Sequence, residues 1–220
     1  MFVLTADQID SRSHADAVAE ALARIDEVAP GGLLLPAERT AGDEIQALTD
    51  RADTAFRLLL ELTRDGRWSV GIGVGPVRLP LGDSTRASTG DAFFAAREAI
   101  EAAKRTPSRF ALRAQPDPAR APDPAGEQAP GTTSDRLRPA DVEALVGLVL
   151  ALRGKRTPKG WEVHDLLASG ATQSRAAASL GITQGAVSMR ARTGSSREEI
   201  AASEALVRLL AMLDATTTEG

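Results

Sequence analysis

The chain has 220 residues, of which 43% are hydrophobic and 25% charged, and 26 basic residues against 30 acidic ones give a formal net charge of −4. It contains no cysteine and only two histidines, which excludes disulfides, thiol chemistry and cysteine zinc sites and disfavours a histidine metal cage. Seven aromatic residues are too few for a base-stacking platform. The longest apolar run, 144–152, is shorter than a membrane span, and Asp7 interrupts the start of the chain before a signal-peptide core forms. We therefore expect a cytoplasmic protein.

One segment without core-forming residues divides the chain. Residues 115–135 contain five prolines and no Val, Ile, Leu, Phe or Trp, a composition typical of an extended linker. We therefore expect one domain at 1–114 and a second at 136–220. Within the second, residues 153–197 hold eight basic side chains against two carboxylates, an excess of six that favours a polyanionic partner.

Short apolar runs alternate with helical patterns in the first 114 residues. In chain order they predict a strand at 2–5, a helix at 14–28, strands at 33–35 and 45–48 joined through Gly42-Asp43, a helix at 51–64, a strand at 68–77, a helix at 92–104 and a strand at 110–112. This βαββαβ order with an additional αβ pair predicts an α+β domain with a ferredoxin-like sheet covered by helices.

Two aspartates and a glycine-rich strand form a candidate nucleotide site. Asp7 ends the first strand and Asp43 lies in a turn between two strands, so both carboxylates are expected within a few ångströms, where they would hold a divalent metal against phosphates. Alone, each aspartate is equally an ordinary cap or turn residue. The sequence GIGVG at 71–75 is not a dinucleotide loop, because the third glycine is wrongly spaced and Pro76 follows.

This arrangement resembles the catalytic domain of class III nucleotide cyclases and the related diguanylate cyclases, whose GGDEF signature is similar to AGDEI in this chain. The resemblance implies that Asp7 and Asp43 hold Mg²⁺ or Mn²⁺, that Arg39 belongs to the hairpin pattern, and that Arg97 stabilises the transition state. Phe93 stands where class III cyclases carry an asparagine, and loss of one such donor costs about 10²- to 10³-fold in rate. We therefore expect a catalytically degenerate domain that senses a nucleotide or mediates dimerisation.

The second part of the chain is helical throughout, with His164 expected on a helix surface. Helices are predicted at 140–153, where Pro139 marks the start, and at 161–168 and 196–214. Between them, residues 173–192 read QSRAAASLGITQGAVSMRAR, with Ala177, Gly181 and Val187 at the fifth, ninth and fifteenth positions. A small residue, a turn glycine and a β-branched residue at these positions resemble the helix-turn-helix of bacterial regulators.

If 183–192 is the recognition helix, its outward side chains are of types that read base edges. Gln184 suits adenine, Arg192 suits guanine or a phosphate, and Met189 suits a thymine methyl. The candidate groove residues are Thr183, Gln184, Gly185, Ser188, Met189 and Arg192, together with Arg190, which occupies a usually apolar position. The candidate phosphate contacts are Ser174, Arg175, Lys155, Arg156 and Lys159. The structural alternative is a trihelical packing unit with a solvated basic face.

Taken in order, DQIDSR, GDE, GIGVG, GDAFFAAREAI and the helix-turn-helix resemble the SatD family of bacterial proteins over residues 2–105 and 160–195. We therefore expect a transcriptional regulator that binds double-stranded DNA as a homodimer, with a nucleotide as its candidate effector. One alternative is a metal-dependent nucleotide cyclase or nucleotidyltransferase. Another is a pair of protein-interaction modules.

Overall fold

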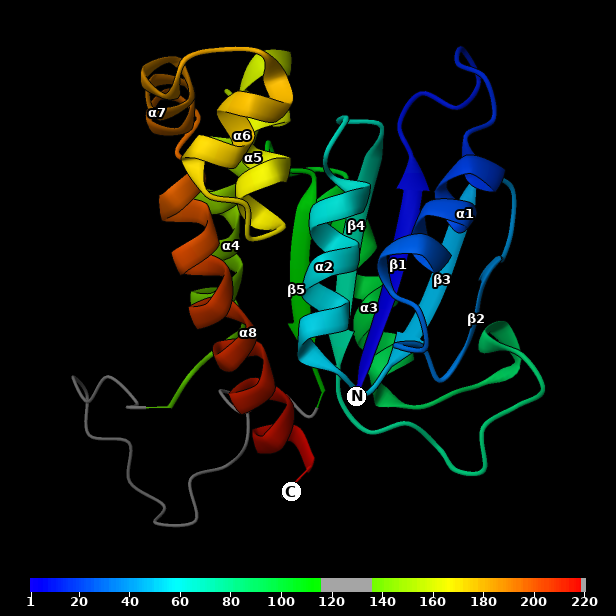
Figure 1. Cartoon of the computed structure of the whole chain (residues 1–220). Coiled ribbons are helices and arrows are strands. Elements are labelled where there is room, and N and C mark those ends of the chain that lie inside the picture. Colours follow the sequence, from blue (N-terminus) through cyan, green and yellow to red (C-terminus); the bar gives the residue numbers. More distant parts are fainter. Residues whose placement is uncertain (116–135, 219–220) are drawn as a thin grey trace.

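The computed structural model describes residues 1–115 and 136–218 and is built around one mixed sheet of five strands (Figure 1). The strands are β1 (Phe2–Gln8), β2 (Leu35–Arg39), β3 (Glu44–Thr49), β4 (Trp68–Val74) and β5 (Phe110–Ala114). Their spatial order is β2-β3-β1-β4-β5, in which neighbours are antiparallel except for the parallel pair β4 and β5. The expected α+β class is therefore correct.

Helices cover both faces of this sheet. On one face α1 (Val18–Val28) and α2 (Ala52–Leu62) pack against alternate residues of β1 such as Phe2 and Leu4. On the other face α3 (Asp91–Ala103), which follows the short 3₁₀ helix η1 (Thr85–Ala87), packs against Val3. Because successive strand residues point to opposite faces, β1 is buried on both sides.

Two elements begin at least two residues later than the sequence predicts. Helix α1 begins at Val18 because residues 10–14 form a turn, in which the Ser13 and His14 N–H groups donate to the Asp10 carbonyl. Strand β2 is Leu35–Arg39 instead of 33–35, and it carries polar residues because it is the edge strand and only partly buried.

The glycines of β4 allow α3 to lie directly on the strand backbone. A Cβ atom at Gly71 would stand 2.3 Å from the Ile100 nitrogen, and one at Gly73 would stand 2.1 Å from the Ala92 carbonyl oxygen. Real Cβ atoms do not approach backbone so closely, so a larger residue at either position would force the helix away. The GIGVG sequence is therefore explained by helix packing.

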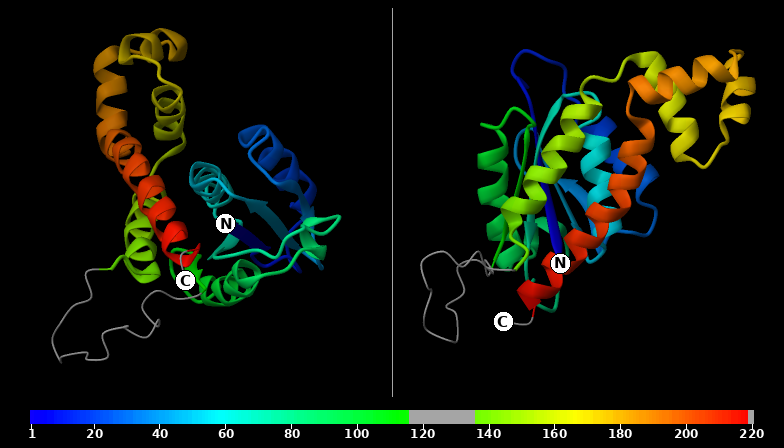
Figure 2. Two further views of the ribbon diagram at one scale, coloured as in Figure 1. Left: turned by 90° about the horizontal axis from the view of Figure 1, so that it is seen from below. Right: turned by 90° about the vertical axis from the view of Figure 1, so that its left-hand side faces the viewer.

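The C-terminal helices divide between two hydrophobic cores. Helices α4 (Pro139–Arg153) and α8 (Ser196–Thr218) pack on β5 and α2 and contribute Val146 and Leu210 to the same core as the sheet. Helices α5 (Pro158–Ala168), α6 (Gln173–Leu180) and α7 (Gln184–Thr193) enclose a second, smaller core. We call α5–α7 the arm, and the rest of the described chain the body; the arm projects from one end of α4 and α8 (Figures 1 and 2).

This division differs from the expected boundary between 1–114 and 136–220, because α4 and α8 share the core of the sheet. Nearly all of the expected linker, residues 116–135, lies outside the described residues. In the described part of the chain, no helix combines the length and apolar character needed to cross a bilayer.

Candidate nucleic-acid interface

The two helices of segment 173–192 are defined by their caps and by one turn glycine. The Thr172 hydroxyl accepts a hydrogen bond from the Arg175 N–H at 3.2 Å, and the Thr183 hydroxyl accepts one from the Ala186 N–H at 3.1 Å. Such caps satisfy N–H groups that have no partner within the helix. Gly181 ends α6 with φ 63°, the left-handed conformation that glycine adopts without strain. Each helix therefore begins and ends on a local signal in the sequence.

Helix α7 buries one side and exposes the other. Val187 and Ala191 are fully buried against α5 and α6, whereas Gly185, Met189 and Arg192 are exposed on the opposite side, with Met189 57% exposed. Thr183 and Gln184 are exposed at the helix start, and Ser188 is half-buried. The helix packs against α5, α6 and α8 and lies at the end of the arm remote from the sheet (Figures 1 and 2). The predicted groove-reading face is therefore open.

Arg190 lies apart from the exposed face of α7. Its side chain is 21% exposed and forms an ion pair with Glu162 of α5, with 3.7 Å between Nη1 and Oε2. This pairing gives the cation at a usually apolar position a partner within the arm. Arg190 therefore contributes less free charge to the surface than the sequence predicts.

Most of the predicted phosphate contacts are exposed on the arm and beside it. Ser174, Arg175, Lys155 and Lys159 are all exposed. Lys155 also lines a groove of about 160 Å³ together with Met189 of α7, so a cation from the α4–α5 loop lies beside the helix face expected to meet DNA. This proximity suits a phosphate contact next to a base contact.

Arg156 is not exposed to a phosphate of the DNA backbone, which corrects the sequence prediction. Its side chain is fully buried and donates to the Gly194 carbonyl through Nε and Nη2, at 2.9 and 2.6 Å, and to Glu199 through Nη2 at 2.6 Å. Arg153 is also buried and pairs with the same carboxylate. Without these two arginines, segment 153–197 keeps six basic residues against two carboxylates, and its excess falls from six to four.

Arg153, Arg156, Trp161, His164 and Glu199 form what we call the junction cluster, where the arm meets the body. Glu199 is 2% exposed and accepts from both arginines. Arg153 also donates to the Leu60 carbonyl of α2 at 2.7 Å, which ties α4 to the sheet domain. The Trp161 ring has the guanidinium carbons of Arg64, Arg153 and Arg156 at 4.5, 4.7 and 4.4 Å from its centroid. A charged cluster therefore holds the arm in place.

His164 belongs to this cluster and not to the helix surface predicted from the sequence. It is 6% exposed, lies edge-on to Trp161, and has Nε2 3.5 Å from the Glu199 carboxylate. Burial lowers the pKa of His164 below its ordinary 6.5; Glu199 opposes that shift, and the charges of Arg156 and Arg153 add to it. The imidazole is therefore neutral near pH 7.

The four residues of the candidate nucleotide site are dispersed. Asp7 faces α3, where its Oδ2 lies 3.0 Å from the Lys104 ammonium. Asp43 lies beside Gln8, on the opposite face, in a concavity of about 250 Å³ that Arg39 and Asp16 also line. The two aspartates thus share one end of the sheet but not one face.

Asp7 and Arg39 of this group each form an ion pair with another side chain of the protein. Burial disfavours the Lys104 ammonium, but Asp7 and Glu101 outweigh this effect, and the pKa of Lys104 lies above its ordinary value. Arg39 donates to Asp16 at 2.8 Å; this bond, after the larger effect of the Val18 N–H, lowers the pKa of Asp16.

The remaining residues of this group lie on α3. Arg97 is exposed, and Phe93 is partly buried against the core between α3 and the sheet. In residues 1–115 and 136–218, no three His, Cys, Asp or Glu side chains converge as a metal site would require.

Comparison of the chain with family models, with curated proteins and with solved structures finds no match in any of the three.

Proposed function

We propose that this protein is a sequence-specific DNA-binding regulator whose α6 and α7 form a helix-turn-helix and whose α7 enters the major groove. The observation that carries the proposal is the exposed face of α7, on which Gln184, Met189 and Arg192 stand free at the end of the arm. A packing helix would instead turn these side chains toward a neighbour. Exposed Lys155 beside Met189 and exposed Arg175 on α6 favour phosphate binding.

The body is proposed to be a degenerate, cyclase-like domain of the SatD type. The spatial order of β1 to β4 supports a ferredoxin-like assignment. The position of Phe93 and the separation of Asp7 from Asp43 by the sheet support a sensing or dimerising role over catalysis.

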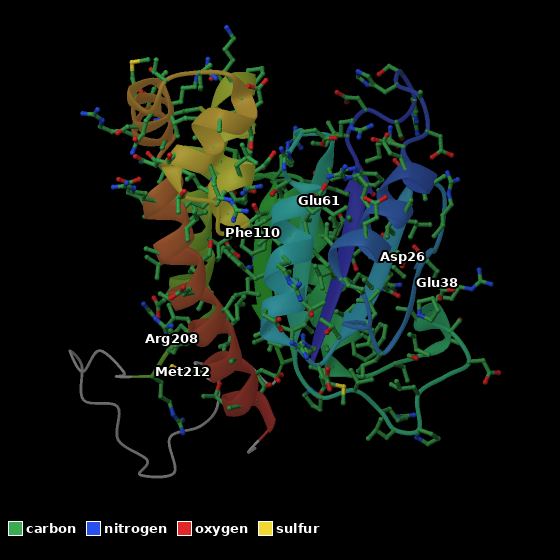
Figure 3. All side chains as sticks on the ribbon, in the orientation of Figure 1. Asp26, Glu38, Glu61, Phe110, Arg208 and Met212 are labelled. Atoms are coloured by element: carbon green, nitrogen blue, oxygen red, sulfur yellow. The ribbon has the colours of Figure 1, made fainter. Side chains whose placement is uncertain are left out.

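A homodimer is the form in which such a protein would read two half-sites. Leu145 and Leu148 on α4 and Met212 on α8 are 43%, 65% and 57% exposed. Met212 and Arg208 lie on the side of α8 that faces away from the sheet (Figure 3). These apolar side chains support packing against a second copy, and a two-fold dimer predicts half-sites about one helical turn, or a multiple of it, apart.

The direct test is selection of binding sites for the full-length protein from random duplexes, followed by titration of the selected site at several salt concentrations. We expect an enriched, two-fold symmetric motif and an affinity that falls steeply with salt. Arg175→Ala should reduce the slope of log K against log salt by about one. Arg86→Ala, which removes an exposed charge far from the arm, should leave the slope unchanged. Absence of any enriched motif, together with no binding in dilute buffer, would refute the proposal.

A further inference from the structure

A cavity between the arm and the body has the walls of an anion site. It measures about 600 Å³ and is bounded by the end of α2, the turn before β5, the end of α4 and the start of α5. Four arginines line it: Arg64, Arg109, Arg153 and Arg156. Asp65 is the one carboxylate among the lining residues, and it is already paired with Arg67. Arg64 is paired with Asp165 outside the lining, and Arg153 and Arg156 share Glu199. In the described part of the chain no carboxylate pairs with Arg109, so the cavity keeps a net positive charge.

Two of these arginines are buried without enough acceptors. Arg153 and Arg156 are 7% and 6% exposed and share the single carboxylate of Glu199, so one positive charge is unbalanced. His164 does not change this balance, because its lowered pKa keeps it neutral near pH 7. Among the described residues, Nε of Arg153 and Nη1 of Arg156 have no hydrogen-bond partner. Buried N–H groups rarely lack an acceptor. Both arginines line the cavity, so an anion bound there would bring acceptor oxygens to the pair.

The outer wall adds charge and backbone strain. Arg109 is exposed, and its φ of 52° lies in the left-handed region that a side chain other than glycine seldom adopts. Such strain concentrates at ligand sites. Ser108 lines the cavity next to Arg109, and its hydroxyl donates to the Thr106 hydroxyl at 3.4 Å.

The walls also indicate which part of a ligand is recognised. Both available aromatic side chains are occupied, since Trp68 is 2% exposed and Trp161 is surrounded by three guanidinium groups. A nucleobase would find no free ring to stack on. Guanidinium groups, by contrast, match phosphate oxygens in pairs. The recognised group is therefore a phosphate and not a base.

We infer that this cavity binds a small phosphate-bearing molecule, through Arg64, Arg109 and the buried arginine pair. The ligand would contact the α2 end and the β5 turn of the body together with α5 of the arm, so its binding would fix the orientation of α7. The binding step stands without the proposed DNA function; only its consequence for α7 rests on that proposal.

Intrinsic fluorescence of the full-length protein gives a specific test, because the two tryptophans of the chain, Trp68 and Trp161, both line this cavity. Inorganic pyrophosphate, which does not absorb at the wavelengths used, is the first probe. We expect a saturable fluorescence change and a rise in melting temperature with ligand concentration. Arg109→Asn, which removes the charge and tolerates positive φ, should weaken binding tenfold or more, and Arg64→Gln should do the same. Arg105→Asn, an exposed control outside the cavity, should change affinity less than twofold.

Calorimetry with inorganic phosphate and with nucleoside triphosphates then distinguishes a free phosphate from a phosphorylated metabolite. Either source supports the inference if Arg109→Asn weakens its binding. Three results would overturn it: no saturable binding of any of these probes at millimolar concentration; loss of binding in Arg39→Gln with Arg109→Asn unaffected; or loss in Arg192→Ala with Arg109→Asn unaffected. All titrations are done without DNA, so failure here leaves the DNA-binding proposal intact.

Discussion

The body and the arm are stabilised by different kinds of side chain. Fully buried residues of the body include the large Phe2, Phe56 and Phe110. The buried residues of the arm core are all small: Val163, Ala176, Ala177, Val187 and Ala191. Because hydrophobic stabilisation is proportional to the apolar area buried, about 25 cal/mol per Å², the body gains far more from its core than the arm does.

The arm therefore depends on its attachment. That attachment is mainly polar. Trp161 of α5 lies against Arg153 and Arg156, which share the carboxylate of Glu199. Arg64 of the body pairs with Asp165 of α5 at 2.6 Å. Apolar packing has no charge that a ligand or a proton can alter, whereas an ionic junction has several. The difference suggests that the fold of the body is fixed while the position of the arm is open to regulation.

The largest effect is expected from Glu199→Gln, which leaves two buried arginines without their carboxylate. Breaking a buried ion pair on one side costs about 3–5 kcal/mol. We expect the free energy of unfolding, measured in urea, to fall by that amount. Glu198→Gln changes the exposed neighbour and should stay within about 0.5 kcal/mol of the native protein. Equal effects of the two substitutions would show that the junction cluster contributes little.

A substitution in the body should act through packing instead of charge. Gly73→Ala places a methyl group 2.1 Å from the Ala92 carbonyl oxygen, so α3 must move, at a cost of about 1–3 kcal/mol. Gly147→Ala is the matched control, because its added Cβ has no neighbour within 4 Å and lies inside α4. Since alanine favours a helix interior over glycine by about 1 kcal/mol, the control should be stabilised. Thermal unfolding of both variants measures the difference.

Most helices and strands followed from the sequence because their signals are local, although α1, β1 and β2 have bounds other than those predicted. The apolar spacing at 51–64 predicted α2 to within two residues at its C-terminus, and α6 and α7 both begin within the motif at 173–192. Each such signal is contained within one or two turns of chain.

The burial of the charged side chains could not be predicted from the sequence, because their partners are far away along the chain. Arg156 and Glu199 are 43 residues apart, and a lone arginine in a basic segment gives no sign that it is buried. His164 was assigned to the surface for the same reason. These positions depend on how α4, α5 and α8 meet, which composition does not encode.

The face of the sheet to which a side chain points is a second feature that the sequence did not predict. The sequence predicted a strand at 2–5 with Asp7 at its end, but β1 continues to Gln8. Asp7 thus lies inside the strand, and alternation directs it to the α3 face, away from Asp43. Because β1 is three residues longer than predicted, the carboxylates of Asp7 and Asp43 lie on opposite faces of the sheet.

Substitutions on the exposed face of α7 and in the loop beside it should change DNA binding in different ways. Arg192→Ala should weaken binding to the selected duplex by about 1–3 kcal/mol and relax the preference at one base pair, if Arg192 reads a base edge. Lys155→Ala should weaken binding to all sequences alike, because a phosphate contact carries no sequence information. Competition titrations with single-base variants of the site measure both. Uniform loss in Arg192→Ala would assign this residue to the backbone.

The smallest expected effect is the change in folding stability with pH that His164 of the junction cluster causes. Because the pKa of His164 is lowered in the folded protein, the unfolded chain takes up a proton first as the pH falls below the ordinary value of 6.5. Stability should therefore decline from that pH downward, until the folded-state pKa is reached.

His164→Gln should remove this decline, and urea unfolding between about pH 5 and pH 7 compares the two slopes. Asp16 and Glu20, whose pKa values are also lowered, titrate below their ordinary 3.8 and 4.5 and so act outside this window. Identical slopes would mean that His164 takes up its proton alike in the folded and unfolded chains, and that it contributes no pH dependence to the stability of the protein. That result would leave anion binding in the cavity untouched, because the phosphate titrations test it independently.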